Sequence, residues 1–288
     1  IWYNTTSQTL KGLEFAAAAW STGGNLTTAR NSLAGAGTQT AGLAFGGSDT
    51  PNATEEYNGS SWTNGGNMGT GRSQLGGCGT QTAGLAVGGE LPPATTATEE
   101  YNGSSWTAGG ALGTARRLQG ALGTQTAALS FGGLPASTAT EEYNGSSWTA
   151  GGTMGTPRFY IAGCGIQKAG LAFGGKTPSV TGATEEYNGS SWTAGGALNT
   201  VRSALGAAGL QTAALGFGGN APPFTNATEQ YDGSSWTNTS AMNTARNSLA
   251  GAGLQPTALA FGGINSDPEN ATEEFDGGGP ATVTLSGS

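Results

Sequence analysis

The sequence contains no histidine, and this absence removes several classes of chemistry. Histidine is the commonest general base near neutral pH and the commonest side-chain ligand of transition metals. Charge is also scarce, because only 10% of the 288 residues are charged, and the net charge is −8. The isoelectric point of about 4.5 argues against a basic surface, so we expect no nucleic-acid partner.

Cysteines and long apolar segments are equally rare. Only Cys78 and Cys164 occur, so the sequence has no disulfide framework. No apolar run reaches the roughly 18 residues that a membrane helix needs, so we expect no membrane span. The chain begins with Ile1 rather than Met, which indicates a processed or truncated product.

Glycine, in contrast, is abundant. It makes up 54 of the 288 residues, whereas a usual content of about 7% would give roughly 20. Glycine does not recur at every third position, which excludes collagen. Seven Trp, seven Tyr and nine Phe argue against a disordered chain. The glycines instead follow an internal repeat.

Three landmarks define this repeat, and each occurs six times. The sequence ATEEYNGSSWTNGG around Trp62 returns every 42 or 44 residues, with a degenerate copy around Trp20. The second landmark is an apolar run that ends in Gly-Gly, and the third is a lone arginine. The tryptophans are Trp20, Trp62, Trp106, Trp148, Trp192 and Trp236, and the arginines are Arg30, Arg72, Arg116, Arg158, Arg202 and Arg246.

A period of roughly 40–50 residues with several short strands is typical of a propeller blade. Each copy offers four strands: a small-residue strand a such as 32–38, an apolar strand b that ends in Gly-Gly, strand c with the sequence ATEEYN, and strand d with SSWT. Asn58-Gly59, between strands c and d, predicts a tight hairpin with a type I′ turn.

The order of arginine, apolar strand with Gly-Gly, Glu-x-Tyr-Asn or Asp, and tryptophan resembles the Kelch motif. The resemblance implies an all-β fold, a six-bladed Kelch-like β-propeller with four-stranded blades. The N-terminal sequence IWYNTTSQTLKGLEF resembles a short segment of bacteriophage tail-fibre and other virion proteins. We therefore divide the chain into a virion-like segment or outer strand at 1–13, the propeller at 14–276 and a C-terminal extension at 277–288.

The number of strands also predicts how the ring closes. The last strands a and b, at 247–263, have no tryptophan after them, so the strand around Trp20 should complete the last blade. This closure by the N-terminal strand, the velcro of Kelch propellers, leaves no open sheet edge. KGLEF at 11–15 and ATEEF at 271–275 both fit strand c of that blade. We favour ATEEF, with 1–13 outside, and ATVTL at 281–285 is a candidate for a further edge strand.

We interpret the recurring residues as structural. One arginine and one glutamate per blade predict an ion pair, with the glutamate at 56, 100, 142, 186 and 274 and Gln230 as the exception. Trp and Tyr are expected between blades. The doublet Glu55-Glu56 does not suit a two-carboxylate glycosidase, because adjacent strand residues point to opposite faces. Cys78 and Cys164, in strands a of non-adjacent blades, predict two buried free thiols.

Specific recognition is expected where the copies differ. All length variation lies between strands b and c, where the loops have five or seven residues, and the segment between strands d and a also varies. Both connections leave a four-stranded blade at the same end, and loops on a rigid scaffold are common binding sites. The candidate binding residues are Asp49, Leu91, Arg117, Phe159, Tyr160, Lys176, Phe224 and Asp267.

These observations favour a non-catalytic protein with no metal and no cofactor. Galactose oxidase, a Kelch-type enzyme, needs histidine ligands for copper, and this chain has none. We expect a structural or adhesive module of a phage-like virion (a fibre, spike or capsid decoration), at the virion surface or otherwise extracellular. Its partners would be other virion subunits or a host-surface glycan or protein. A further copy of the same chain, in a homo-oligomer, is another candidate partner. The alternative is a secreted or cell-surface bacterial propeller that binds carbohydrate like a lectin.

Overall fold

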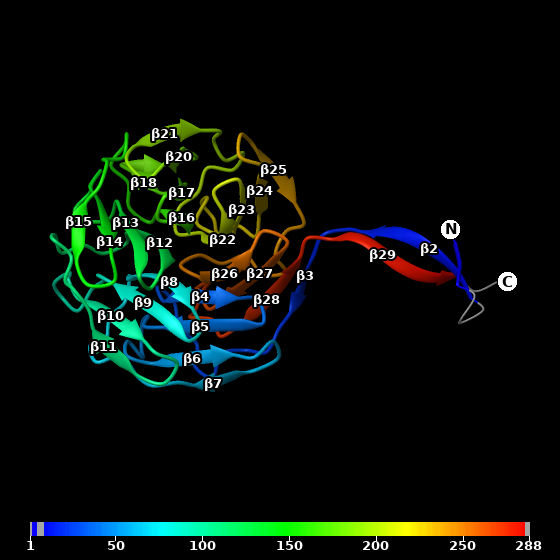
Figure 1. Ribbon diagram of the computed structural model, residues 1–288, viewed down its shortest axis with the longest axis horizontal. Helices are drawn as coiled ribbons and strands as arrows, with labels where there is room; N and C mark the ends of the chain where they lie inside the picture. The colour runs from blue at the N-terminus through cyan, green and yellow to red at the C-terminus, as the bar shows by residue number, and fades with distance from the viewer. Residues whose placement is uncertain (1, 5–8, 286–288) are drawn as a thin grey trace.

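The computed structural model describes residues 2–4 and 9–285 of the chain. These residues form strands and turns and no helix. Six antiparallel four-stranded sheets, the blades, surround a central axis, and a separate ribbon extends from the ring (Figure 1). The predicted all-β, six-bladed propeller with four-stranded blades is therefore confirmed.

Strand a of each blade lies closest to the axis, and strand b follows it outward (Figure 1). Strand a consists largely of glycine and alanine, because neighbouring strands crowd at the axis. A Cβ on Gly35, for example, would lie only 2.6 Å from the Phe261 ring. Strand b is buried on both faces, which explains its unbroken apolar sequence. Strands a are β4 (Ala34–Thr38), β8 (Gly76–Thr80), β12 (Gly120–Thr124), β16 (Ala162–Ile166), β22 (Gly206–Leu210) and β26 (Ala250–Leu254). Strands b are β5 (Ala41–Phe45), β9 (Ala83–Val87), β13 (Ala127–Phe131), β17 (Ala169–Phe173), β23 (Ala213–Phe217) and β27 (Thr257–Phe261).

Strands c and d complete each blade on the outside. Blades 1 to 6 are numbered in the order of their strands a. Strands c are β6 (Thr54–Tyr57), β10 (Thr98–Tyr101), β14 (Thr140–Tyr143), β20 (Thr184–Tyr187), β24 (Thr228–Tyr231) and β28 (Thr272–Asp276). Strands d are β7 (Trp62–Asn64), β11 (Trp106–Ala108), β15 (Trp148–Ala150), β21 (Trp192–Gly195), β25 (Trp236–Thr239) and β3 (Ala19–Thr22).

The turn between strands c and d differs from the prediction. Four residues, 58–61, connect the two strands in blade 1, and only Gly59 has a positive φ, of 90°. A type I′ turn needs a positive φ at two successive residues, so that prediction was wrong. Asn58 Oδ1 instead accepts hydrogen bonds from the backbone N–H groups of the two serines that follow, at 3.0 and 2.9 Å. Asp232 has the same role in blade 5, where these bonds lower its pKa to about 2.

The ring closes as predicted. Strand β3, from the N-terminal part of the chain, pairs with β28 and completes blade 6, with Trp20 opposite Phe275. The indole Nε1 of Trp20 donates to Thr228 Oγ1 of blade 5 at 3.0 Å. The equivalent Trp–Thr hydrogen bond joins every neighbouring pair of blades, including Trp62 to Thr272 across the closure. The closing blade therefore keeps the Trp–Thr contact of the other interfaces.

In blade 6 the turn between strands c and d is replaced by a three-stranded ribbon, which we call the arm. Strand β29 (Gly279–Leu285) leaves β28 and pairs with β2 (Thr9–Ala16), which leads back into β3. Strand β1 (Trp2–Asn4) pairs with the other edge of β2. The C-terminal ATVTL sequence thus forms a strand of the arm rather than an edge of a blade. The arm projects well beyond the ring (Figure 1).

Candidate functional site

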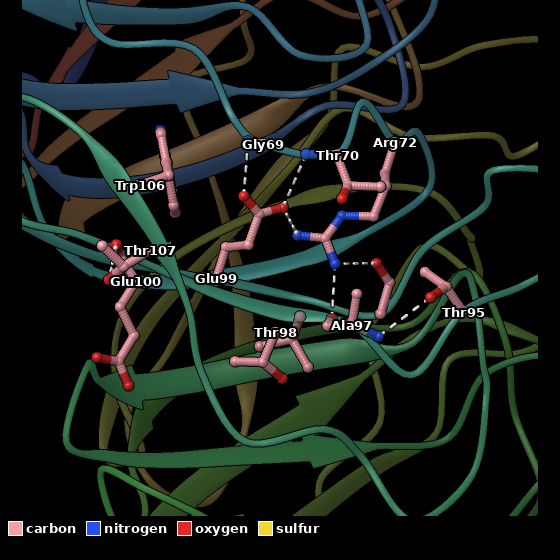
Figure 2. Close-up of polar contacts among 12 residues, drawn as sticks. Gly69, Thr70, Arg72, Thr95, Ala97, Thr98, Glu99, Glu100, Trp106 and Thr107 are labelled. Carbon is pink, nitrogen blue, oxygen red and sulfur yellow. Dashed lines mark hydrogen bonds and ion pairs between the residues drawn. The ribbon is translucent and has the colours of Figure 1, made fainter.

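All six recurring arginines are buried beside a glutamate of their own blade. Arg72 Nη2 lies 3.0 Å from Glu99 Oε1, and its Nη1 donates to the backbone oxygen of Ala97 (Figure 2). The partner is the first glutamate of each doublet, so our prediction of the second was wrong. Strand alternation places the two glutamates on opposite faces but does not say which face holds the arginine. The pairs are Arg30–Glu55, Arg72–Glu99, Arg116–Glu141, Arg158–Glu185, Arg202–Glu229 and Arg246–Glu273.

Apart from the buried Arg72 Nε, which has no hydrogen-bond partner among the described residues, the polar groups of this pair are used within the protein. Glu99 Oε2 accepts a hydrogen bond from the backbone N–H of Gly69 at 2.7 Å. Burial lowers the pKa of Arg72, and the charge of Glu99 acts in the opposite direction. Both side chains are at most 7% exposed. Such a buried, hydrogen-bonded pair serves the architecture, because a solvent-borne ligand does not reach it.

The second glutamate of the doublet contacts the next blade instead. Tyr101 Oη donates to Glu56 Oε1 at 2.6 Å, and the same contact recurs at five of the six interfaces. Desolvation, followed by this hydrogen bond, raises the pKa of Tyr101 to about 12. The interface between blades 5 and 6 differs, because it has Gln230 in place of the glutamate and Phe275 in place of the tyrosine.

A third replacement accompanies these two. A Cβ on Gly195 would lie 2.7 Å from the hydroxyl oxygen of Tyr231, so this interface requires glycine at that position. The equivalent residue between blades 5 and 6 is Thr239, which faces a ring without a hydroxyl group. Ser240 follows it and donates its hydroxyl to Ala18 O, close to where the arm leaves. The exceptional interface therefore lies beside the arm.

Sequence analysis missed one recurring residue, a glutamine in the turn between strands a and b. Gln81 Nε2 donates to the backbone oxygens of Gly42 and Tyr57 in the preceding blade, at 3.1 and 2.6 Å. The signal was present, because a glutamine directly follows every strand a. The six are Gln39, Gln81, Gln125, Gln167, Gln211 and Gln255.

Cys78 and Cys164 are both buried free thiols, as expected. Burial raises the pKa of each to about 12. A thiol with so high a pKa is a poor nucleophile at neutral pH.

The connections that vary between copies meet at one end of the propeller, which we call the loop face. In five blades a residue before strand a forms a β-bridge with a residue after strand b, for example Arg117 with Leu134 and Phe159 with Lys176. The b–c and d–a connections are therefore neighbours, as expected. The turns between strands a and b and between c and d lie at the opposite end, and the arm takes the place of one of the latter.

A ring of six backbone hydrogen bonds surrounds the axis at the loop face. Each member donates its N–H to the carbonyl of the equivalent residue in the preceding blade, at 2.8 or 2.9 Å, and the last bond runs from Ser32 to Ser248. All members have a positive φ, between 52° and 58°, although none is glycine. The ring bonds offset that backbone strain. The members of this axial ring are Ser32, Gln74, Leu118, Tyr160, Ala204 and Ser248.

Only some of the candidate binding residues lie close together in the structure. Tyr160 and Lys176 line one cleft, and the Phe159 ring packs 5.7 Å from that of Tyr160. Arg117 forms an ion pair with Glu90 in a hollow between blades 2 and 3. Four other candidates are exposed on separate b–c loops and do not join the cleft. They are Asp49, Leu91, Phe224 and Asp267.

The cleft spans blades 4 to 6 and has a volume of about 320 Å³, and we call it the blade 4–6 cleft. Sequence analysis missed its amide and hydroxyl groups, because they come from three blades whose loops are distant in sequence. These missed residues are Ser203, Asn220, Asn247 and Ser248.

Within residues 2–4 and 9–285, no three His, Cys, Asp or Glu residues cluster in a way that could hold a metal ion. The described part of the chain also contains no helix long and apolar enough to span a membrane. Comparison with models of known protein families gives no match. Comparison with curated proteins gives no match either.

Proposed function

We propose that the protein is a non-catalytic binding module that engages its partner through the loop face. One observation carries this proposal: the recurring charged and aromatic residues are used in contacts within and between blades, whereas the residues that differ between blades lie at the loop face and at the base of the arm. Large apolar side chains are exposed there, with Leu91 at 52% and Phe224 at 38%. Ile166, Leu210 and Leu254 are also exposed at the opposite end, so exposure alone does not distinguish the loop face.

The carboxylates support a non-catalytic role. In each doublet the first glutamate neutralises a buried arginine, and in five blades the second accepts a hydrogen bond from a tyrosine. General acid–base chemistry needs a carboxyl group within reach of a substrate. The doublets have other partners and are repeated around the ring, so no single centre stands out.

The arm supports attachment to a larger assembly. It leaves from the end of the propeller that carries the c–d turns, so the loop face at the other end stays available. The Kelch-like repeat and the tail-fibre-like N-terminal segment point to a phage-like virion, as a fibre, spike or capsid decoration. We propose that the arm contacts other virion subunits and that the loop face contacts a host-surface glycan or protein.

Two measurements test this proposal. Mass spectrometry of purified particles should find the chain in many copies. Phe224→Ala, on the exposed b–c loop of blade 5, should weaken attachment to host cells while the melting temperature is unchanged. Unchanged attachment together with no binding on a glycan array would reject the adhesive role.

The second candidate is a secreted or cell-surface lectin-like propeller of a bacterium. The blade 4–6 cleft favours it, because an aromatic ring beside amides and hydroxyls suits a sugar. Detection of the chain in the culture medium or cell envelope, and its absence from particles, would select this candidate.

A further inference from the structure

The blade 4–6 cleft combines features that no other described part of the loop face brings together. It is lined by one aromatic ring, one ammonium group, two side-chain amides, two hydroxyls and the apolar residues Val180, Ala204 and Pro222, and by no acidic residue. Its volume of about 320 Å³ falls within the roughly 300–1,000 Å³ typical of small-ligand pockets. We propose that this cleft binds a sugar that carries a carboxylate group. This inference rests on the proposed binding role of the loop face and specifies its ligand.

The preference for an anion comes from Lys176. Six of the ten basic residues are arginines buried in ion pairs, and Arg117 is paired with Glu90. Lys168 lies in the turn between strands a and b of blade 4, at the opposite end, and Lys11 belongs to the arm. Lys176 is exposed and forms no ion pair with any described residue. It is therefore the one basic side chain on the described loop face that a carboxylate can pair with.

The preference for a sugar comes from the neighbouring polar groups. The backbones of Asn220 and Asn247 are held by paired hydrogen bonds to Ser203 and Ile264, which fix where each side chain begins. Both asparagines line the cleft. An amide offers both a donor and an acceptor, as do the hydroxyls of Ser203 and Ser248. Such groups match the hydroxyls of a sugar ring.

Tyr160 supplies the only aromatic ring of the cleft. The other members of the axial ring are Ser, Gln, Leu and Ala, so the backbone ring does not require an aromatic residue there. The Tyr160 ring packs against Phe159, which holds it in position beside the axis. A fixed aromatic face can cover the C–H face of a sugar at little cost in side-chain entropy.

The experiment compares carboxylate sugars with their neutral forms. The whole chain is applied to an array of oligosaccharides that contain uronic or sialic acids, each printed beside its methyl ester. Lys176→Met removes the charge and keeps most of the side-chain stem, and Lys176→Arg keeps the charge. Lys168→Thr is the matched control, because it removes one charge at the opposite end and copies Thr126 of blade 3. The melting temperature of each variant shows that it is folded.

We expect binding of free acids to be about fivefold tighter than binding of their esters, as for one partly exposed ion pair. Lys176→Met should abolish this difference, and Lys176→Arg and Lys168→Thr should keep it. Equal binding of acids and esters by the unaltered chain, or a preference that survives Lys176→Met, would overturn the inference and leave a glycan-binding loop face in place. If the unaltered chain binds no glycan on the array, the inference and the glycan-binding function both fail.

Discussion

At the scale of single residues, the two adjacent glutamates of five blades have different roles. Glu99 is buried against Arg72, whereas Glu100, its neighbour in sequence, accepts a hydrogen bond from Tyr143 of the next blade at 2.6 Å. Figure 2 shows Glu99 joined to Arg72, while Glu100 lies away from it. The pattern Glu-Glu thus stabilises a blade internally and also attaches it to its neighbour.

We predict that Glu99→Ala destabilises the fold much more than Glu100→Ala. Loss of Glu99 leaves the buried Arg72 without a counter-charge, and breaking such a pair costs about 3–5 kcal/mol. Loss of Glu100 removes a hydrogen bond to a charged acceptor, worth about 1.5–3 kcal/mol. Urea unfolding of both variants measures the difference. Equal losses would contradict the separate roles.

The tyrosines between blades predict a loss of stability at high pH. Desolvation and a glutamate hydrogen bond raise the pKa to about 12 in the folded chain for Tyr57, Tyr101, Tyr143, Tyr187 and Tyr231. In the unfolded chain these tyrosines lose their protons near pH 10. The unfolded state therefore binds fewer protons above pH 10, and the free energy of unfolding falls between about pH 10 and 12.

Thermal melts across this range, with absorbance of the tyrosinate ion recorded in parallel, measure the effect. A melting temperature that stays constant from pH 9 to 12 would show that these five hydroxyl groups are not protected in the folded state.

At the scale of elements, the sequence predicted the blades because their landmarks are local. Gly-Gly ends strand b, and Trp begins strand d in five blades, so both strands could be placed without a structure. The predicted type of the turn at Asn58 was wrong, because the turn geometry depends on how many residues separate the paired ends of the strands. The predicted partner of Arg72 was wrong, because strand alternation places neighbouring residues on opposite faces of the sheet but does not say which face holds the arginine.

The interface between blades 5 and 6 allows a direct test of how blades fit together. We predict that Phe275→Tyr is destabilising by about 1–3 kcal/mol, because the added hydroxyl meets the side chain of Thr239. Adding Thr239→Gly and Gln230→Glu to that variant recreates the other five interfaces and should recover the loss. The reverse case is Gly195→Thr, which should be tolerated only together with Tyr231→Phe.

Urea unfolding of the single and combined variants gives the coupling free energy between these positions. Additive effects, with no recovery in the combined variant, would mean that the three replacements are unrelated.

At the scale of the whole molecule, the sixfold repeat supplies rigidity, and we propose that the residues that differ between blades supply specificity. Trp–Thr bonds and Gln side chains connect neighbouring blades around the entire ring, including the closure. The exceptions gather at two places, the loop face and the base of the arm. The sequence identified Tyr160 and Lys176 as exceptions, but it could not show that they share a cleft with Asn220 and Asn247, because loops from three blades form it.

The most direct test separates the shared scaffold from the residues that differ between blades. It replaces two loop-face residues of blade 4 with the residues that blade 5 has at the same positions. The variant Tyr160→Ala with Lys176→Asn copies the equivalent residues Ala204 and Asn220, which the scaffold already accepts. Binding of this variant to isolated host-surface glycans is the decisive measurement, with Lys168→Thr at the opposite end as the control. The account predicts that binding is lost while the melting temperature is unchanged. Full binding by the double variant, or an equal loss in Lys168→Thr, would contradict it.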